Sequence, residues 1–192
     1  VVKFTLKDSN SVAQSSYNKR NSSLSDQTKR GQILSANQKI LAYSENNEAG
    51  DEIRHYPYEN MFAHIIGYTS YGKAGLEAVC NKELLTSHEK LMKQLSNGVA
   101  SQKNIGDNVI TTLDTRLQKA AYEALDDYRG AVVAIEPKTG KVRALVSKPD
   151  FDPNKLDDMW NKITSDSSQS CLLNRATQGL YPPGSTYKIL TA

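Results

Sequence analysis

Long apolar runs are missing from this sequence of 192 residues. No run approaches the roughly 18 apolar residues that a membrane-spanning helix needs, and no signal-peptide pattern is present. Hydrophobic residues make up only 38% of the chain, and its aromatic residues are ten tyrosines against three phenylalanines and one tryptophan. Globular chains usually reach about 45–50% apolar residues. The composition therefore predicts an open protein with a large surface rather than one thick core.

Cysteine and net charge are also scarce. Cys80 and Cys171 lie far apart and lack metal-ligand spacing, so we expect two free thiols, with a disulfide as the open alternative. The 24 basic and 21 acidic residues leave a net charge of only +3. Such a small, scattered excess argues against nucleic acid as a partner and is typical of mixed solvated faces. The length allows one large or two small domains.

The end of the chain carries the sharpest chemical signal. Pro182, Pro183 and Gly184 prevent a helix up to that point, and nothing interrupts one afterwards. Ser185 is therefore expected at a helix N-terminus, with Lys188 one turn later on the same face. A serine hydroxyl beside an amine that can lose its proton is an activated nucleophile for acyl transfer.

The spacing Ser-x-x-Lys is not specific by itself, because it occurs four times in this sequence. The copies that begin at Ser16, Ser70 and Ser87 lie in polar or glycine-interrupted stretches. Only Ser185 combines a rigid Pro-Pro-Gly approach with an apolar continuation. From the residues alone, a helix N-cap remains an equal alternative for Ser185, since serine is a favoured cap residue.

Residues 174–188, Asn-Arg-Ala-Thr-Gln-Gly-Leu-Tyr-Pro-Pro-Gly-Ser-Thr-Tyr-Lys, resemble the active-site approach of the penicillin-binding transpeptidases. Ser-x-x-K is a known motif of that family. The resemblance implies that Ser185 is the acylated nucleophile and Lys188 its general-base partner. It implies no metal and no organic cofactor.

Two earlier segments resemble class B, the monofunctional branch of the family. Residues 30–42 read as a β-hairpin around Ser-Ala-Asn-Gln and are similar to the Arg-Gly-x-Ile…Asn-Gly-x-x-Leu-Ala signature, with Gln38 in place of its usual glycine. Residues 75–85 read as a helix that buries Leu76, Val79, Cys80, Leu84 and Leu85, and they resemble the Gly-Leu-Glu helix of the class B pedestal. In that helix Glu77 is expected to make a structural polar contact.

The predicted fold class is α+β. Residues 1–107 are expected to form an extended pedestal, or dimerisation, domain, and residues 108–192 the opening portion of a transpeptidase domain. The sequence predicts strands at 1–6, 109–113, 131–135 and 142–146, and helices at 115–129 and 156–163. The first of these helices is expected to begin at Asp114, to end at Gly130 and to bury an Ala- and Leu-rich face. Residues 44–55 are expected to be a loop, and residues 88–95 a helical turn or two.

Several tempting residues are better explained structurally. Lys138-Thr139-Gly140 matches the family's Lys-Thr-Gly motif by letters, but it precedes the nucleophile and reads as a hairpin turn. The three Ser-x-Asn matches also lie upstream. His64 has no catalytic constellation in the sequence and is expected to be a structural histidine. The two accessory motifs do not follow Ser185 in this chain, so we expect these 192 residues by themselves to be inactive.

By resemblance, the parent protein cross-links peptidoglycan outside the bacterial cell membrane, held by a single anchor upstream of Val1. Its substrate would be the D-Ala-D-Ala end of a stem peptide, and β-lactams would acylate the same serine. A second hypothesis is a non-catalytic scaffold that docks a glycosyltransferase or divisome or elongasome proteins. A third, a β-lactam sensor or serine β-lactamase, is disfavoured by the pedestal-like segments.

Overall fold

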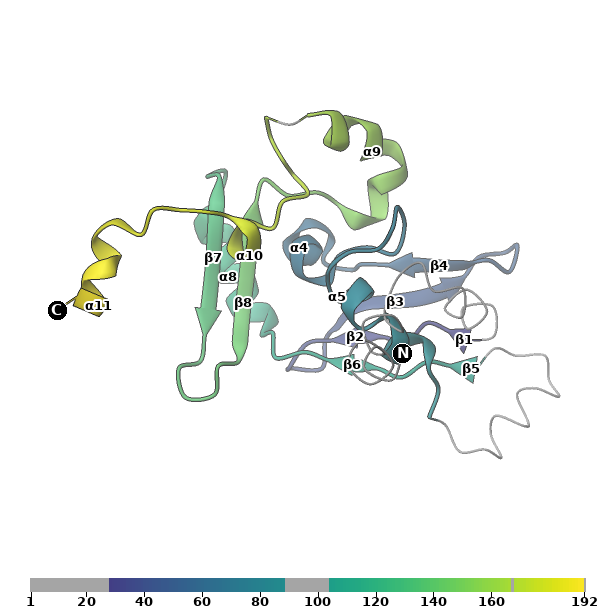
Figure 1. Cartoon of the computed structure of the whole chain (residues 1–192). Helices are drawn as coiled ribbons and strands as arrows, with labels where there is room; N and C mark the ends of the chain where they lie inside the picture. The colour runs from purple at the N-terminus through teal and green to yellow at the C-terminus, as the bar shows by residue number, and fades with distance from the viewer. Residues whose placement is uncertain (1–27, 89–103, 167, 192) are drawn as a thin grey trace, which may run out of the picture.

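The computed structural model describes residues 28–88, 104–166 and 168–191. These ranges mix short helices with three small sheets, which confirms the α+β class (Figure 1). The strand expected at 1–6 and most of the helical turns expected at 88–95 lie outside the described residues. Within the described part, no helix is long and apolar enough to cross a membrane.

The first half is organised around a four-stranded sheet in the order β4-β3-β2-β6. Strand β2 (Ile33–Leu34) runs antiparallel to β3 (Ile40–Asn46) and parallel to β6 (Val109–Ile110), and β3 is antiparallel to β4 (Glu52–His55). The loop expected over residues 44–55 is therefore wrong. The sequence pattern did not predict strands in residues 44–55, because most of these side chains are polar and do not alternate in hydrophobicity. Much of their surface is exposed to solvent.

The predicted hairpin at 30–42 is confirmed. The backbone N–H of Ser35 donates to the carbonyl oxygen of Lys39 across the turn, at 2.9 Å. Gln38 takes a φ of 59°, a left-handed conformation that glycine adopts with less strain. The signature's glycine thus corresponds to a real conformational demand, which glutamine meets here.

Short helices pack beside this sheet. Residues 59–66 form the 3₁₀ helix η1 (Glu59–Phe62) and α4 (Ala63–Ile66), and the Gly-Leu-Glu segment forms α5 (Gly75–Val79) and α6 (Asn81–Leu85). The apolar face expected for this segment is partly wrong, because Val79 is 62% exposed while Glu77 is buried. The helical segment is interrupted at Cys80, between the two helices. The buried side chain of Glu77 binds Arg30 and, in β4, Arg54, and that of Asn81 binds Arg30.

The second half places α8 (Thr115–Leu125) against the antiparallel pair β7 (Gly130–Ile135) and β8 (Val142–Lys148). The Asp114 carboxylate accepts hydrogen bonds from the backbone N–H groups of Arg116 and Leu117, which confirms the predicted cap. The end expected at Gly130 is wrong, because the helix stops at Leu125 and Asp126 turns to a positive φ of 44°.

The buried face of α8 also differs from the expectation. Leu117 is exposed, whereas Thr115, Gln118 and Ala121 are buried. The cause is the sheet beside the helix, which offers free backbone groups that a polar side chain can bind. Sequence periodicity counts apolar residues only and cannot detect such a contact.

Two further pieces complete the described fold. Pro153–Lys155 (η2) leads into α9 (Leu156–Ser165), whose predicted helical spacing is confirmed. Strand β1 (Thr28–Lys29) pairs in parallel with β5 (Asn104–Ile105). Because β6 follows residue 107 and joins β2, the chain on either side of the proposed domain boundary shares one sheet; the boundary itself stays a prediction. Both cysteine thiols are free.

Candidate active site

The approach to Ser185 is fixed to the second half by α10 (Arg175–Gln178). Asn174 caps this helix through its side-chain oxygen, which accepts from the backbone N–H of Ala176 at 3.1 Å. The other end of the same amide donates to the carbonyl oxygen of His64 in α4 at 3.3 Å. One asparagine therefore starts the helix and links it to the first half of the chain.

Arg175 provides the second attachment. Its backbone N–H donates to the hydroxyl of Ser147 in β8 at 3.0 Å, and its buried guanidinium donates to the carbonyl oxygens of Gln169 and Ser170 at 2.8 and 3.2 Å. The hydroxyl of Ser147 in turn donates to the carbonyl of Leu173 at 3.2 Å. A buried arginine thus closes the loop 169–175 and holds it on the edge of the β7–β8 pair.

Ser185 and Lys188 follow on a short helical segment that extends away from this anchor (Figure 1). Gly184–Tyr187 is a 3₁₀ helix, η3, and Lys188–Thr191 continues as α11. The backbone N–H of Lys188 donates to the carbonyl oxygens of Ser185 and Thr186. Residues three apart lie on the same face in a 3₁₀ helix and in an α-helix, so the serine in η3 and the lysine that begins α11 are expected to share one face.

The start of this segment has the expected stiffness. Gly184 adopts a φ of 54°, and the hydroxyl and backbone N–H of Thr186 both donate to the carbonyl oxygen of Pro183. The side chain of Ser185 does not act as a cap hydrogen bonder here, because Pro183 holds the N-cap position. This removes the structural alternative that the sequence left open for Ser185 and leaves its hydroxyl free for another role.

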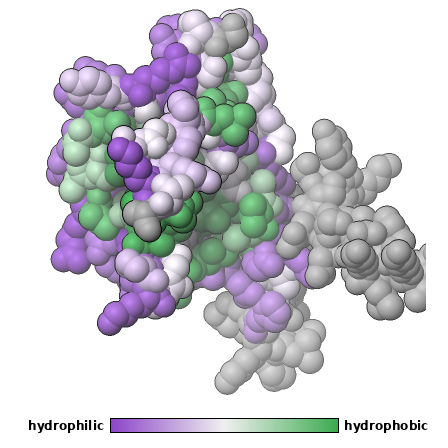
Figure 2. Space-filling view, turned by 60° about the vertical axis from the view of Figure 1, so that its left-hand side comes forward, coloured by the Kyte–Doolittle hydropathy of each residue, from purple (hydrophilic) through white to green (hydrophobic). Residues whose placement is uncertain are grey.

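The segment around the serine is exposed. Leu180 is 97% exposed and Ile189 86%, and Ser185 and Lys188 are themselves on the surface. Figure 2 brings the side of the molecule with β7 and α11 toward the viewer and shows apolar surface gathered on it. No hydrogen bond joins the Ser185 hydroxyl to the Lys188 amine, both of which lie in the described part of the chain.

Known protein families match both halves of the chain. Residues 30–109 match the penicillin binding protein A dimerisation domain, and residues 130–192 match the penicillin binding protein transpeptidase domain. This chain belongs to the penicillin-binding protein family. The order of the two matches, with the dimerisation domain first, also agrees with the class B resemblance drawn from residues 30–42 and 75–85.

Individual relatives agree with this assignment. Peptidoglycan D,D-transpeptidase PbpA of Mycolicibacterium smegmatis is 39% identical over 179 residues, covering 84% of this chain and 36% of the relative. Peptidoglycan D,D-transpeptidase MrdA of Escherichia coli is 33% identical over 174 residues, covering 72% of this chain and 28% of the relative. The chain therefore spans about a third of the length of these curated relatives.

A solved structure matches closely as well. Penicillin-binding protein A from M. tuberculosis, as an imipenem acyl-enzyme complex, superposes with a TM-score of 0.75 at 36% identity, covering 86% of this chain and 41% of that one. The described fold of this penicillin-binding protein is thus shared with a relative in which a β-lactam has formed an acyl-enzyme.

The other residues considered from the sequence have structural roles. His64 has its Nε2 2.8 Å from the carbonyl oxygen of Cys171, and Glu77 binds two arginines. Residues 138–140 lie in the β7–β8 turn, where Gly140 has a φ of 71° and its N–H donates to the carbonyl of Glu136 at 2.8 Å. These expectations are confirmed, and none of the three brings a side chain to Ser185.

Sequence reasoning missed the anchor itself. Ser147 follows directly after the strand predicted at 142–146 and Arg175 lies in the motif at 174–188, and no sequence signal links the two residues. The dipeptide Asn174-Arg175 offered one clue, because asparagine is a preferred N-cap and so predicts a helix start at Arg175.

Proposed function

We propose that Ser185 is the acylated nucleophile of a peptidoglycan D,D-transpeptidase and that Lys188 is its general base. The single observation that carries this is that Ser185 and Lys188 lie three residues apart in one continuous helical segment, which belongs to the transpeptidase match. The Ser-x-x-K motif of this family provides the chemistry.

In the proposed reaction, the hydroxyl oxygen of Ser185 attacks the carbonyl carbon between the two D-alanines of a stem peptide. The Lys188 amine takes the hydroxyl proton and passes it to the leaving D-alanine amine, so an ester replaces the peptide bond. An acceptor amine then attacks the ester, forms the cross-link and returns a proton to Ser185. β-Lactams acylate the same oxygen but leave a stable ester. The reaction needs no metal or organic cofactor.

The 192 residues alone are expected to be a poor catalyst. Ser185 and Lys188 are exposed, so water reaches the nucleophile. By resemblance, the oxyanion hole takes one donor from the backbone N–H of Ser185 and a second from a strand after the Lys-Thr-Gly motif, which does not follow Ser185 in these residues. Removal of one oxyanion-hole donor costs about 3 kcal/mol in other serine enzymes. Because peptidoglycan lies outside the cytoplasmic membrane, the whole protein is expected at the outer face of the bacterial cell membrane, on an anchor before Val1.

Labelling of the full-length protein with a fluorescent penicillin tests the assignment. We expect one labelled site, which peptide mass spectrometry places at Ser185, and complete loss of the label in Ser185→Ala. Ser70→Ala is the matched control, because Ser70 begins another Ser-x-x-Lys spacing and should label normally. Labelling that survives in Ser185→Ala would refute the proposal.

A further inference from the structure

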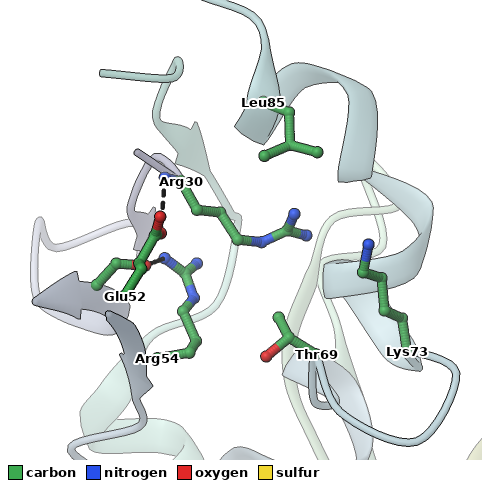
Figure 3. A pocket seen from close by; sticks show the side chains of 7 residues that line it. Arg30, Glu52, Arg54, Thr69, Lys73 and Leu85 are labelled. Carbon is green, nitrogen blue, oxygen red and sulfur yellow. Dashed lines mark hydrogen bonds between the residues drawn. The ribbon is translucent and has the colours of Figure 1, made fainter. Parts of the chain in front are cut away.

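A cavity between the sheet and the α4–α5 connection is lined by charged side chains. It has a volume of about 270 Å³ and is lined by Arg30, Ser44, Glu52, Arg54, Thr69, Lys73 and Leu85. Figure 3 shows Arg30 and Lys73 extending toward each other from opposite sides, with Thr69 beside them. The cavity is separate from the anchor of the Ser185 segment, since it shares no residue with that anchor.

Most of the hydrogen-bonding groups around this cavity are already used. Arg30 donates from Nε to Glu77 Oε2 at 2.6 Å, from Nη1 to Asn81 Oδ1 at 2.7 Å and from Nη2 to the Glu77 carbonyl at 2.6 Å. Arg54 donates from Nε to Glu77 Oε1 at 2.8 Å and from Nη1 to the Gly31 carbonyl at 2.7 Å. Both oxygens of Glu77 are therefore occupied, one by each arginine.

Two buried donors of this network are left over, Arg54 Nη2 and Asn81 Nδ2, and only Arg54 is among the residues that line the cavity. Nη2 of Arg54 has no hydrogen-bond partner, and water cannot replace one because only 6% of the Arg54 side chain is exposed. A buried unsatisfied donor is costly, and one on a charged group costs more. Nη2 has almost no accessible surface in the present arrangement, so a small shift of the Arg54 side chain toward the cavity would let a bound ligand accept this hydrogen bond and remove the cost.

The net charge of the groups around this cavity favours an anion as the ligand. The cationic groups are Arg30, Arg54 and Lys73, and the carboxylates are Glu52 and Glu77, which leaves one positive charge in excess. The oxygen Oε1 of Glu52 is engaged with the backbone N–H of Arg30 at 2.9 Å. Burial and the nearby Arg30 charge lower the pKa of Lys73, and the charge of Glu77 opposes them only in part.

We propose that this cavity binds a carboxylate monoanion, with Arg54 Nη2, the Lys73 ammonium and the Thr69 hydroxyl as donors. A single negative charge balances the excess, whereas a phosphate dianion would overcompensate it and would also meet the carboxylate of Glu52. Charge-assisted hydrogen bonds to arginine and lysine suit a planar carboxylate. The bound group would bridge β4, which carries Arg54, and the connection of residues 67–74 between α4 and α5.

Titration of the full chain, labelled with ¹⁵N-arginine, tests the site at constant ionic strength. Acetate represents a free carboxylate and N-acetyl-aspartyl amide represents an acidic side chain of a protein partner; inorganic phosphate is the competitor class. We expect the Nε–H signal of Arg54 to shift saturably with at least one of the two carboxylates. Saturation with acetate alone identifies a small-molecule site, and saturation with both identifies one that an acidic side chain can also fill.

Variants at Lys73 give the decisive comparison. Lys73→Met should weaken carboxylate binding by about tenfold or more, because it removes one charge-assisted hydrogen bond, while Lys73→Arg should retain it. Lys138→Met is the control, because Lys138 is exposed in the β7–β8 turn and its replacement removes the same charge at a position that does not line the cavity. Equal affinity in Lys73→Met, equal weakening in the two methionine variants, or tighter binding of phosphate than of acetate would each overturn the proposal.

Discussion

Gln118 and Leu145 exchange two hydrogen bonds between a helix side chain and a strand backbone. The Gln118 Nε2 donates to the Leu145 carbonyl oxygen at 2.7 Å, and the Leu145 N–H donates to Gln118 Oε1 at 2.8 Å. The same Nε2 also donates to the carbonyl of Met61 in η1 at 2.8 Å. This fully buried amide therefore continues the hydrogen bonding of β8 and ties both halves of the chain together.

Replacement of Gln118 by methionine should destabilise the protein by roughly 2–5 kcal/mol. The side chain keeps its length, but the backbone groups of Leu145 and Met61 lose partners, and each buried unsatisfied group costs about 1–3 kcal/mol. Urea unfolding followed by circular dichroism measures the change. Gln169→Met, at an exposed loop position, is the control and should change stability by less than about 0.5 kcal/mol. A loss for Gln118→Met no larger than the control's would contradict this role.

Neutralisation of Glu77 should be at least as damaging. Glu77 is fully buried and pairs with Arg30 at 2.6 Å and with Arg54 at 2.8 Å. Glu77→Gln removes the carboxylate that is paired directly with two buried guanidiniums and turns an amide N–H₂ toward one of them, so we expect a loss of about 3–5 kcal/mol. The exposed variant Glu123→Gln removes only an i,i+4 pair with Lys119 and should cost about 0.5 kcal/mol or less. Similar urea midpoints for the two variants would show that the buried charge is unimportant.

His64 makes stability depend on pH. Burial lowers the pKa of His64 from its ordinary value of 6.5, only partly opposed by its contact with the Cys171 carbonyl and by the charge of Asp150. The unfolded chain therefore binds a proton at a higher pH than the folded chain does. The free energy of unfolding should fall as the pH decreases through 6.5 toward the folded-state pKa, and His64 should contribute no penalty above 6.5.

Urea unfolding between pH 5 and pH 8 isolates this contribution when the parent is compared with His64→Gln. Glutamine can still donate to the Cys171 carbonyl but does not titrate, so its stability should fall less steeply below about pH 6.5. If His64→Gln follows the parent's pH profile, the buried histidine is not the source of the dependence.

Local signals in the sequence predicted a large part of this fold. The Asp114 cap, the hairpin around Gln38, the β7–β8 turn and the helical spacing of Leu156 and Ile163 each depend on neighbours a few residues away. Capping, turn geometry and periodicity are local properties. The proposed site residues Ser185 and Lys188 likewise came from a continuous motif.

The features that were missed depend on partners far along the chain. Gln118 is buried because Met61 and Leu145 present free backbone groups, and Val79 is exposed because Glu77 turns inward toward arginines more than 20 residues away. A strand as polar as β4 is held by pairing with β3 rather than by burial of an apolar face. None of these causes leaves a periodic trace in the sequence.

A glycine at the end of α4 provides a final test of how closely the α4–α5 connection packs. Gly67 has a φ of 82° and a ψ of −148°, a region that is essentially restricted to glycine. A Cβ at this position would also collide with the backbone of Ala74 and Gly75. Gly50 also has a positive φ, 89°, but a Cβ added there would meet no other atom within 4 Å, so of the two sites only Gly67 is crowded.

Gly50→Ala should therefore cost about 1–2 kcal/mol, from backbone strain alone. Gly67→Ala adds the displacement of packed backbone, which costs a further 1–3 kcal/mol, so we expect a total of about 3 kcal/mol or more. Urea unfolding of the two variants measures the difference directly. Equal losses would mean that Gly67 is required only for its dihedral angles, because the connection would then yield to a methyl group without resistance.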